Sequence, residues 1–126
     1  MRFEQANFSA DKGWYVGPWN SDLAVSVGFA NKGVDKPHVH SRITEIYLVA
    51  RGVAEIRVAQ QTIRLAAGDV IIIEPGEAHT FLSSSPDYYH FVIHTPGLAG
   101  ERARTEKTPV SRARLGLPAY SPPQSK

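Results

Sequence analysis

Apolar and polar residues alternate over short distances between residues 23 and 94, and nothing there keeps a helical apolar period of 3.6 residues over ten positions. The apolar runs are rich in β-branched and aromatic residues, and turn residues such as Arg51-Gly52 and Pro75-Gly76 separate them. The pattern predicts seven strands, at 23–30, 45–50, 53–58, 62–65, 70–74, 79–83 and 88–94. Short strands at such regular spacing are typical of a sandwich or barrel. We therefore expect an all-β, antiparallel fold with meander-like connections.

The strand pattern ends after Pro96-Gly97, where a charged stretch leads to three prolines, Pro118, Pro122 and Pro123. Proline lacks a backbone donor and interrupts regular structure. We expect one β-barrel domain at 1–100 and a basic, Pro-rich C-terminal tail at 101–126. The tail should be irregular or partly helical, with a short helix around 110–115 and loose final residues.

The composition narrows the range of functions. With 126 residues, 42% of them hydrophobic and 21% charged, the chain has room for one globular domain. It has no cysteine, so a metal must be held by nitrogen and oxygen atoms. The N-terminus carries no apolar signal segment, and no run approaches the ~20 apolar residues of a membrane span. The expectation is a cytoplasmic protein with no membrane partner.

Charge is distributed unevenly around the net value of +2. Residues 97–126 hold six Lys or Arg and two acids, whereas residues 1–96 hold eight and ten. Proline, alanine and serine dilute the basic segment, and it contains one aromatic residue. Such a segment is more often a solvated extension than a nucleic-acid site, so we expect no nucleic-acid partner.

Candidate chemistry lies in two clusters, His38-Val39-His40 with Glu45, and His79 further along the chain. In a strand, residues i and i+2 point to the same face, so His38 and His40 present two imidazoles side by side. A four-residue connection can return Glu45 to the same centre, and His79 opens a later strand. Three imidazoles and one carboxylate suit one divalent transition metal ion: Fe, Mn, Ni, Zn, Co or Cu. The spacing does not distinguish among these metals.

These motifs resemble those of the cupin superfamily. Its first motif is Gly, five residues, His-x-His, three or four residues, Glu, six residues, Gly, and residues 33–52 match it with four residues after Gly33. Its second motif, Gly, five residues, Pro-x-Gly-x-x-His, is matched within residues 68–83, with Glu74 where the first proline usually stands. The resemblance implies a jelly-roll β-barrel holding a metal with His38, His40, Glu45 and His79.

The resemblance to cupins indicates the fold and the presence of a metal site more firmly than it indicates which reaction the protein catalyses. The leading hypothesis is a metal-dependent enzyme acting on a small organic acid, sugar acid or phenolic substrate. With iron it would be a dioxygenase, and with Mn, Ni or Zn an isomerase or lyase is equally reasonable. The alternative is a non-catalytic small-ligand-binding or sensor cupin, although sensor cupins usually carry a DNA-binding helical domain for which this chain has no room.

The late strand carries a polar row, Tyr88, His90 and His94, that alternates with an apolar row. The polar row faces either the metal cavity or solvent. In the first case His90 lines the cavity, His94 sits at its edge, and Tyr47 joins them from the Glu45 strand, so these three are candidate catalytic residues. A histidine with an unperturbed pKa of about 6.5 could carry protons near neutral pH.

Two further features concern packing. Trp14 and Trp19 could roof a ligand pocket or cap an open barrel end, and capping is the favoured interpretation. Ile46, Leu48 and the run 70–73 place apolar side chains on both faces of their strands. A barrel has only one inner face, so we expect a homodimer that covers the outer one.

Overall fold

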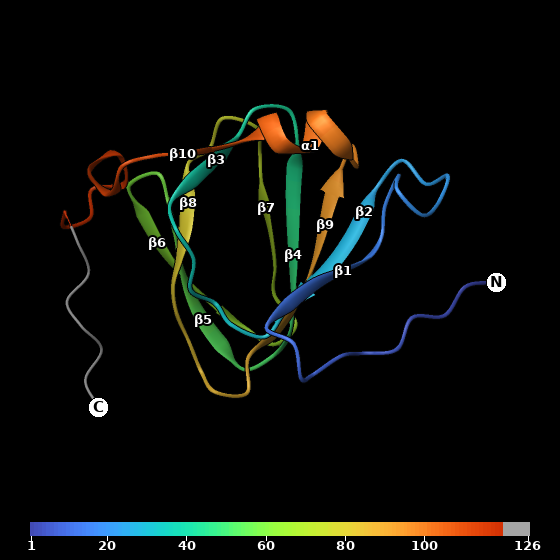
Figure 1. The fold of residues 1–126 in the computed structure, drawn as a ribbon. Helices are drawn as coiled ribbons and strands as arrows, with labels where there is room; N and C mark the ends of the chain where they lie inside the picture. Colours follow the sequence, from blue (N-terminus) through green and yellow to red (C-terminus); the bar gives the residue numbers. More distant parts are fainter. Residues whose placement is uncertain (120–126) are drawn as a thin grey trace.

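The computed structural model describes residues 1–119, which form ten strands, one α-helix and one 3-10 helix (Figure 1). In chain order the elements are β1 (Lys12–Val16), β2 (Ser26–Ala30), β3 (His38–His40), β4 (Thr44–Arg51), β5 (Val53–Val58), β6 (Gln61–Ala66), β7 (Val70–Ile73), β8 (His79–Ser84), β9 (Tyr89–Thr95), α1 (Gly100–Glu106), β10 (Lys107–Pro109) and η1 (Arg112–Leu115). No helix within residues 1–119 is long and apolar enough to cross a membrane.

The strands form two five-stranded antiparallel sheets, with strand orders β1-β2-β9-β4-β7 and β10-β3-β8-β5-β6. The two sheets enclose the interior, and α1 lies across one end of the barrel (Figure 1). The all-β jelly-roll prediction is confirmed.

Side-chain alternation builds the interior. Along β4 every second residue from Glu45 to Val49 is buried, and the intervening residues are half-buried. A cluster of nine buried hydrophobic residues fills the barrel interior. Its members are Tyr47, Val49, Ala54, Ile56, Leu65, Ile73, Phe81, Tyr88 and Val92.

Each of the seven predicted strands is present, with ends displaced by up to three residues. The meander-like connectivity was wrong. Arg51-Gly52 carries the chain from one sheet to the other, because β4 pairs with β7 and β9 while β5 pairs with β6 and β8. Turn residues mark where a strand ends, but they do not determine which strand pairs with it.

Residues 100–115 form α1, β10 and η1 against the barrel, which corrects the description of this segment as a solvated extension. Strand β10 pairs with β3 in the register Lys107↔His40. The 3-10 helix lies within the expected helical range of 110–115, and its Leu115 is fully buried. Arg57 Nε donates a hydrogen bond of 2.8 Å to the Leu115 carbonyl. The expected loose terminus falls largely on residues 120–126, outside the described residues.

Candidate metal centre

The four predicted ligands come together at one end of the barrel interior. His38 and His40 lie on the same face of β3, and His79 at the start of β8 is the register partner of His38. Glu45 enters from β4 in the opposite sheet. One ligand atom from each residue lies within 4.8 Å of the others, and all four residues are buried.

Two hydrogen bonds prepare the imidazoles for a metal. His38 Nδ1 lies 2.8 Å from the Lys36 carbonyl, and His79 Nδ1 lies 2.9 Å from the Glu77 carbonyl. Because a carbonyl only accepts, each Nδ1 carries the proton and donates it. Nε2 is therefore left as the metal ligand on both rings, as in many protein metal sites.

His40 supplies an independent test of the site. Both of its ring nitrogens are buried and have no hydrogen-bond partner among the described residues. Its Nε2 lies 3.5 Å from Glu45 Oε1, longer than an ordinary hydrogen bond. An unpaired buried polar atom costs free energy, which metal coordination would offset. The donor set therefore fits a divalent transition ion, and this buried cluster can hold one.

Glu45 is the electrostatic centre of the cluster. Burial alone would raise its pKa, but the neighbouring imidazoles of His40, His79 and His94 hold the pKa well below the usual range. The opposite effect acts on His79: burial would lower its pKa, yet the Glu45 carboxylate 2.9 Å away raises it. Glu45 is therefore a carboxylate, the form that binds metal.

His94 contacts the second oxygen of the same carboxylate. His94 lies on β9 and is the register partner of Glu45 on β4. Its Nε2 lies 2.7 Å from Glu45 Oε2. The sequence placed His94 at the edge of the cavity with a catalytic role. In the structure it also orients Glu45, a contact between strands 49 residues apart that the spacing did not reveal.

His90 and Tyr47 are buried and line the same cavity as the candidate ligands His38, His40 and Glu45. Of the two alternatives for the polar row of β9, the inward one is observed, because His90 and His94 line the cavity of the candidate ligands. The Tyr88 hydroxyl and His90 Nδ1 are 2.6 Å apart. Burial lowers the pKa of His90 to about 4, so the argument from an unperturbed value near 6.5 does not apply. At neutral pH His90 is a neutral imidazole.

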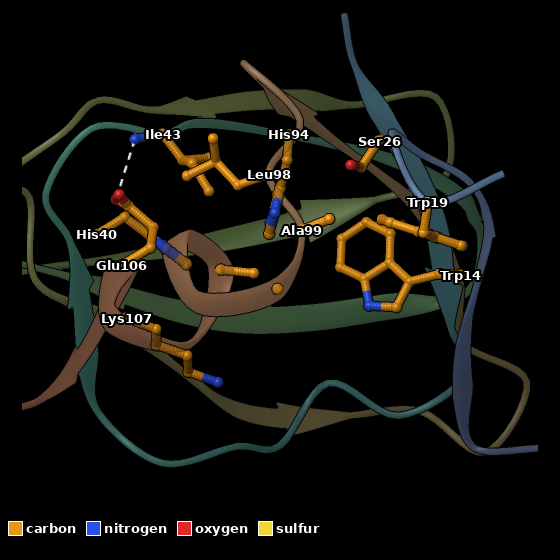
Figure 2. A pocket seen from close by; sticks show the side chains of 12 residues that line it. Trp14, Trp19, Ser26, His40, Ile43, His94, Leu98, Ala99, Glu106 and Lys107 are labelled. Carbon is orange, nitrogen blue, oxygen red and sulfur yellow. Dashed lines mark hydrogen bonds between the residues drawn. The ribbon is translucent and has the colours of Figure 1, made fainter. Parts of the chain in front are cut away.

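Two adjacent chambers lie beside this centre. The metal chamber, of about 530 Å³, is lined by three of the four candidate ligands, His38, His40 and Glu45, together with Tyr47 and His90. A second chamber, of about 520 Å³, is lined by the candidate ligand His40 and by residues of α1 (Figure 2). Trp14, His40, His94 and Lys107 line both.

Glu106 secures α1 and β10 over these chambers. Its side chain is almost fully buried, and its carboxylate accepts hydrogen bonds from Ser41 Oγ and from the backbone N–H groups of Arg42 and Ile43. These residues form the loop between the ligands His40 and Glu45. Burial would raise the pKa of Glu106, but the hydrogen bonds from this loop lower it. No spacing motif marks Glu106, and only the fold brings it to the loop.

The two-sheet barrel and the His-His-Glu-His cluster together define a member of the cupin superfamily. The chain belongs to the family of AraC-like ligand binding domains, whose model matches residues 23–118.

Individual relatives resemble parts of this chain. An uncharacterized protein of Streptomyces coelicolor is 36% identical over 61 residues, which cover 48% of this chain and 55% of that protein. The chain therefore spans about half the length of this curated relative.

Solved structures with the same fold include three proteins from different bacteria. KdgF from Halomonas sp. has a TM-score of 0.59 and 20% identity, covering 69% of this chain and 78% of that one. Pac13 from Streptomyces is described as a nucleoside dehydratase, and variants of it have been solved with uridine. The Pac13 structure has a TM-score of 0.62 and 12% identity, covering 86% of this chain and 92% of that one. An uncharacterized double-stranded β-helix protein from Klebsiella pneumoniae has a TM-score of 0.56 and 25% identity, covering 77% and 85%.

Proposed function

We propose that this chain is a metal-dependent enzyme acting on a small organic acid, sugar acid or phenolic compound. The observation that carries this proposal is the presence of His90 and Tyr47 in the metal chamber, although neither belongs to the ligand cluster. A site that only stored a metal would not need buried proton-bearing groups beside it. Such groups are the usual equipment for moving or holding a proton on a substrate.

A divalent ion held by His38, His40, Glu45 and His79 would polarise oxygen atoms of the substrate as a Lewis acid. The protein's own groups have separate tasks. His94 keeps the Glu45 carboxylate in position through its 2.7 Å contact. Because the Tyr88 hydroxyl can donate to His90 Nδ1, Nε2 of the neutral ring is available to hold a proton toward the substrate.

Tyr47 is suited to donate a hydrogen bond. Burial and the charge of Glu45 raise its pKa well above the ordinary value, so the hydroxyl stays protonated. It lies two residues after Glu45 on the inner face of β4. With iron we propose a dioxygenase, and with Mn, Ni or Zn an isomerase or lyase, because these metals favour different chemistry at one ligand set.

The second candidate is a binding module that holds a small molecule without turnover. The match to AraC-like ligand binding domains favours it. Such a module would bind its ligand in the same chambers, and removal of His90 would change affinity but no rate. Turnover therefore separates the two candidates.

The test begins with metal content. Protein purified without chelator should hold about one metal ion per chain by elemental analysis, and His40→Ala and His79→Ala should each lower this content by about tenfold or more. His90→Phe is the matched control, since His90 is a buried histidine outside the ligand set. Equal metal content in the wild type and both ligand variants would contradict the metal site.

Turnover is then measured against catechols, keto acids and sugar acids. Wild-type protein should convert at least one class, and His90→Phe should reduce kcat by about 10² or more with metal content unchanged. Stoichiometric metal and tight ligand binding without conversion would favour the binding module.

A further inference from the structure

The second chamber lies beside the metal centre, and its lining residues are mostly different from those of the metal chamber. We call it the tryptophan chamber (Figure 2). Its lining residues are Trp14, Trp19, Ser26, His40, Ile43, His94, Leu98, Ala99, Gly100, Ala103, Glu106 and Lys107. Its volume of about 520 Å³ lies within the usual range for small-molecule pockets. It shares Trp14, His40, His94 and Lys107 with the lining of the metal chamber, so a ligand in it would lie beside the metal centre.

The two tryptophans supply flat apolar walls. Trp14 and Trp19 are about half exposed, 47% and 48%, and their rings meet edge to face at 6.2 Å. The sequence favoured packing at a barrel end over the roof of a pocket, and in the structure both side chains also line this chamber. Trp14 also packs against His94, with 4.7 Å between the ring centroids. The indole beside the metal centre is thus positioned to contact a planar apolar group.

Gly28 on β2 makes room for this indole. A Cβ at Gly28 would lie 2.7 Å from a carbon of the Trp14 ring, closer than such atoms approach. The opposite wall is formed by small and aliphatic side chains around α1, including Leu98, Ala99 and Ala103. The chamber therefore accepts a flat apolar body between an aromatic and an aliphatic wall.

One buried hydroxyl in the chamber has no partner. Ser26 is 2% exposed, and its Oγ makes no hydrogen bond among the described residues. It is the register partner of His94, which in turn is the partner of Glu45, so Ser26, His94 and Glu45 form one row across three strands. An unpaired buried hydroxyl is costly, and a polar atom of a ligand would satisfy it.

One cation without an ion pair in the described part of the chain borders the chamber. Lys107 lines both chambers and makes no ion pair within residues 1–119. The carboxylate in the lining, that of Glu106, already accepts hydrogen bonds from the loop between His40 and Glu45. A ligand with one negative charge would therefore meet a free ammonium group at the junction of the chambers.

The same lining disfavours a sugar acid in this chamber. Each ring hydroxyl of a sugar needs a hydrogen-bond partner when buried, and burying one without a partner costs about 1–3 kcal/mol on the protein mutational scale. The walls offer mainly carbon atoms, with Ser26 as the unused hydroxyl. An aromatic ring has no such requirement.

We propose that the tryptophan chamber selects a small aromatic carboxylate, with its ring against Trp14 and its oxygen atoms toward Lys107 and the metal centre. This inference rests on the proposed function for its metal-bound end. It narrows the substrate class from organic acids in general to single-ring aromatic acids. Ser26 would hydrogen-bond a polar ring substituent.

The test measures binding without requiring turnover. Benzoate, 2-hydroxybenzoate and glucuronate are titrated by calorimetry into the full chain, once loaded with Zn²⁺ and once treated with chelator. Trp14 and Trp19 are the two tryptophans of the chain, so indole fluorescence reports directly on the chamber. The aromatic acids should bind at least about tenfold more tightly than glucuronate, and benzoate should change the indole emission. Glucuronate binding as tightly as benzoate would overturn the proposal.

Variants locate the site. Ala103→Phe fills the chamber and should weaken benzoate binding by at least about tenfold, whereas Arg102→Phe on the exposed side of α1 should leave it unchanged. Ser26→Ala should weaken 2-hydroxybenzoate more than benzoate. Trp19→Ala, a truncation at the half-exposed rim, is a second probe in case Ala103→Phe disturbs the helix. Unchanged benzoate affinity in Ala103→Phe and Trp19→Ala would overturn the proposal.

The outcome is separable from that of the proposed function. Normal metal content and turnover of a non-aromatic acid, with no binding of either aromatic acid, would refute the aromatic selectivity alone. Aromatic binding that is lost in Ala103→Phe, without any turnover, would support the chamber while refuting the enzyme.

Discussion

At neutral pH the imidazole of His90 is neutral, because burial lowers its pKa to about 4, and the charge of Glu45 only partly opposes this. Its ring packs against Tyr47 and Phe81, with centroid distances of 4.8 and 5.2 Å. A neutral buried histidine changes the pH dependence of stability in a definite direction. The unfolded chain binds a proton near pH 6.5, whereas the folded chain does so only near pH 4.

We therefore predict that acid destabilises the metal-free protein partly through His90. Between pH 6.5 and 4 the unfolded state binds more protons, so the free energy of unfolding falls as pH is lowered, by up to about 1.4 kcal/mol per pH unit for one proton. His90→Gln should show a shallower fall over this range in urea titrations of chelated protein. Tyr88→Phe, which keeps His90 but removes its hydroxyl partner, should retain the wild-type slope. Identical slopes for wild type and His90→Gln would contradict this assignment.

At the scale of elements, α1 and β10 close the end of the barrel that holds the metal centre (Figure 1). Glu106 ends α1, and its carboxylate holds the loop that joins the ligands His40 and Glu45. The position of this loop sets the separation of two candidate metal ligands. The C-terminal helix is thereby coupled to the geometry of the site.

We expect Glu106→Gln to destabilise the fold by about 2–3 kcal/mol, because a neutral amide replaces a buried charged acceptor. Metal affinity should fall by about tenfold or more, since the support behind the ligands is lost. Glu101→Gln is the matched control, an exposed glutamate on the same helix. Urea unfolding and metal titration measure the two effects. If Glu106→Gln matched Glu101→Gln in both, Glu106 would have no positioning role.

For the whole molecule, the hydrophobic core is built from residues other than the candidate metal ligands. Nine buried residues of the core cluster, among them Ile56 and Phe81, pack between the sheets without contributing a ligand. Burial of this surface supplies the main driving force for folding. The sheet β1-β2-β9-β4-β7 also carries apolar side chains on its outer face, which points away from this core.

The protein should consequently remain folded without metal. Chelation should leave the β-type circular dichroism spectrum intact and lower Tm only through the loss of a ligand of the native state. Thermal melts with and without chelator measure both quantities. A random-coil spectrum after chelation would mean that the metal is structural rather than part of a reactive site.

The outer sheet face leads us to predict a homodimer. Val70 and Ile72 on the edge strand β7 are more than half exposed, at 56% and 55%, and Ile46 and Leu48 are their register partners on β4. An interface of roughly 800 Å² per partner would cover this face. Sedimentation should give a dimer at micromolar concentration, and Val70→Lys with Ile72→Lys should give a monomer. A wild-type mass of 13.8 kDa in solution would refute the dimer.

Local geometry explains what could be predicted from the sequence alone. The i, i+2 spacing of His38 and His40 determines that their side chains share a face in a strand, and the β-rich runs determine an all-β fold. Both follow from contacts within a few residues along the chain. The prediction of the full ligand set also depended on the resemblance of two motifs to those of cupins, because that resemblance assigns Glu45 and His79 to the same metal centre as His38 and His40.

Tertiary structure decided what depends on contacts between distant strands. Alternation separates the two rows of β9, but only the closure of the sheets determines that His90 and His94 face inward. The pairing of β10 with β3 brings Glu106 to the ligand loop, and the pairing of β1 with β2 places Trp14 near Ser26. The identity of neighbouring residues along the chain does not predict such pairings, because register and sheet order depend on which strand faces can be buried together.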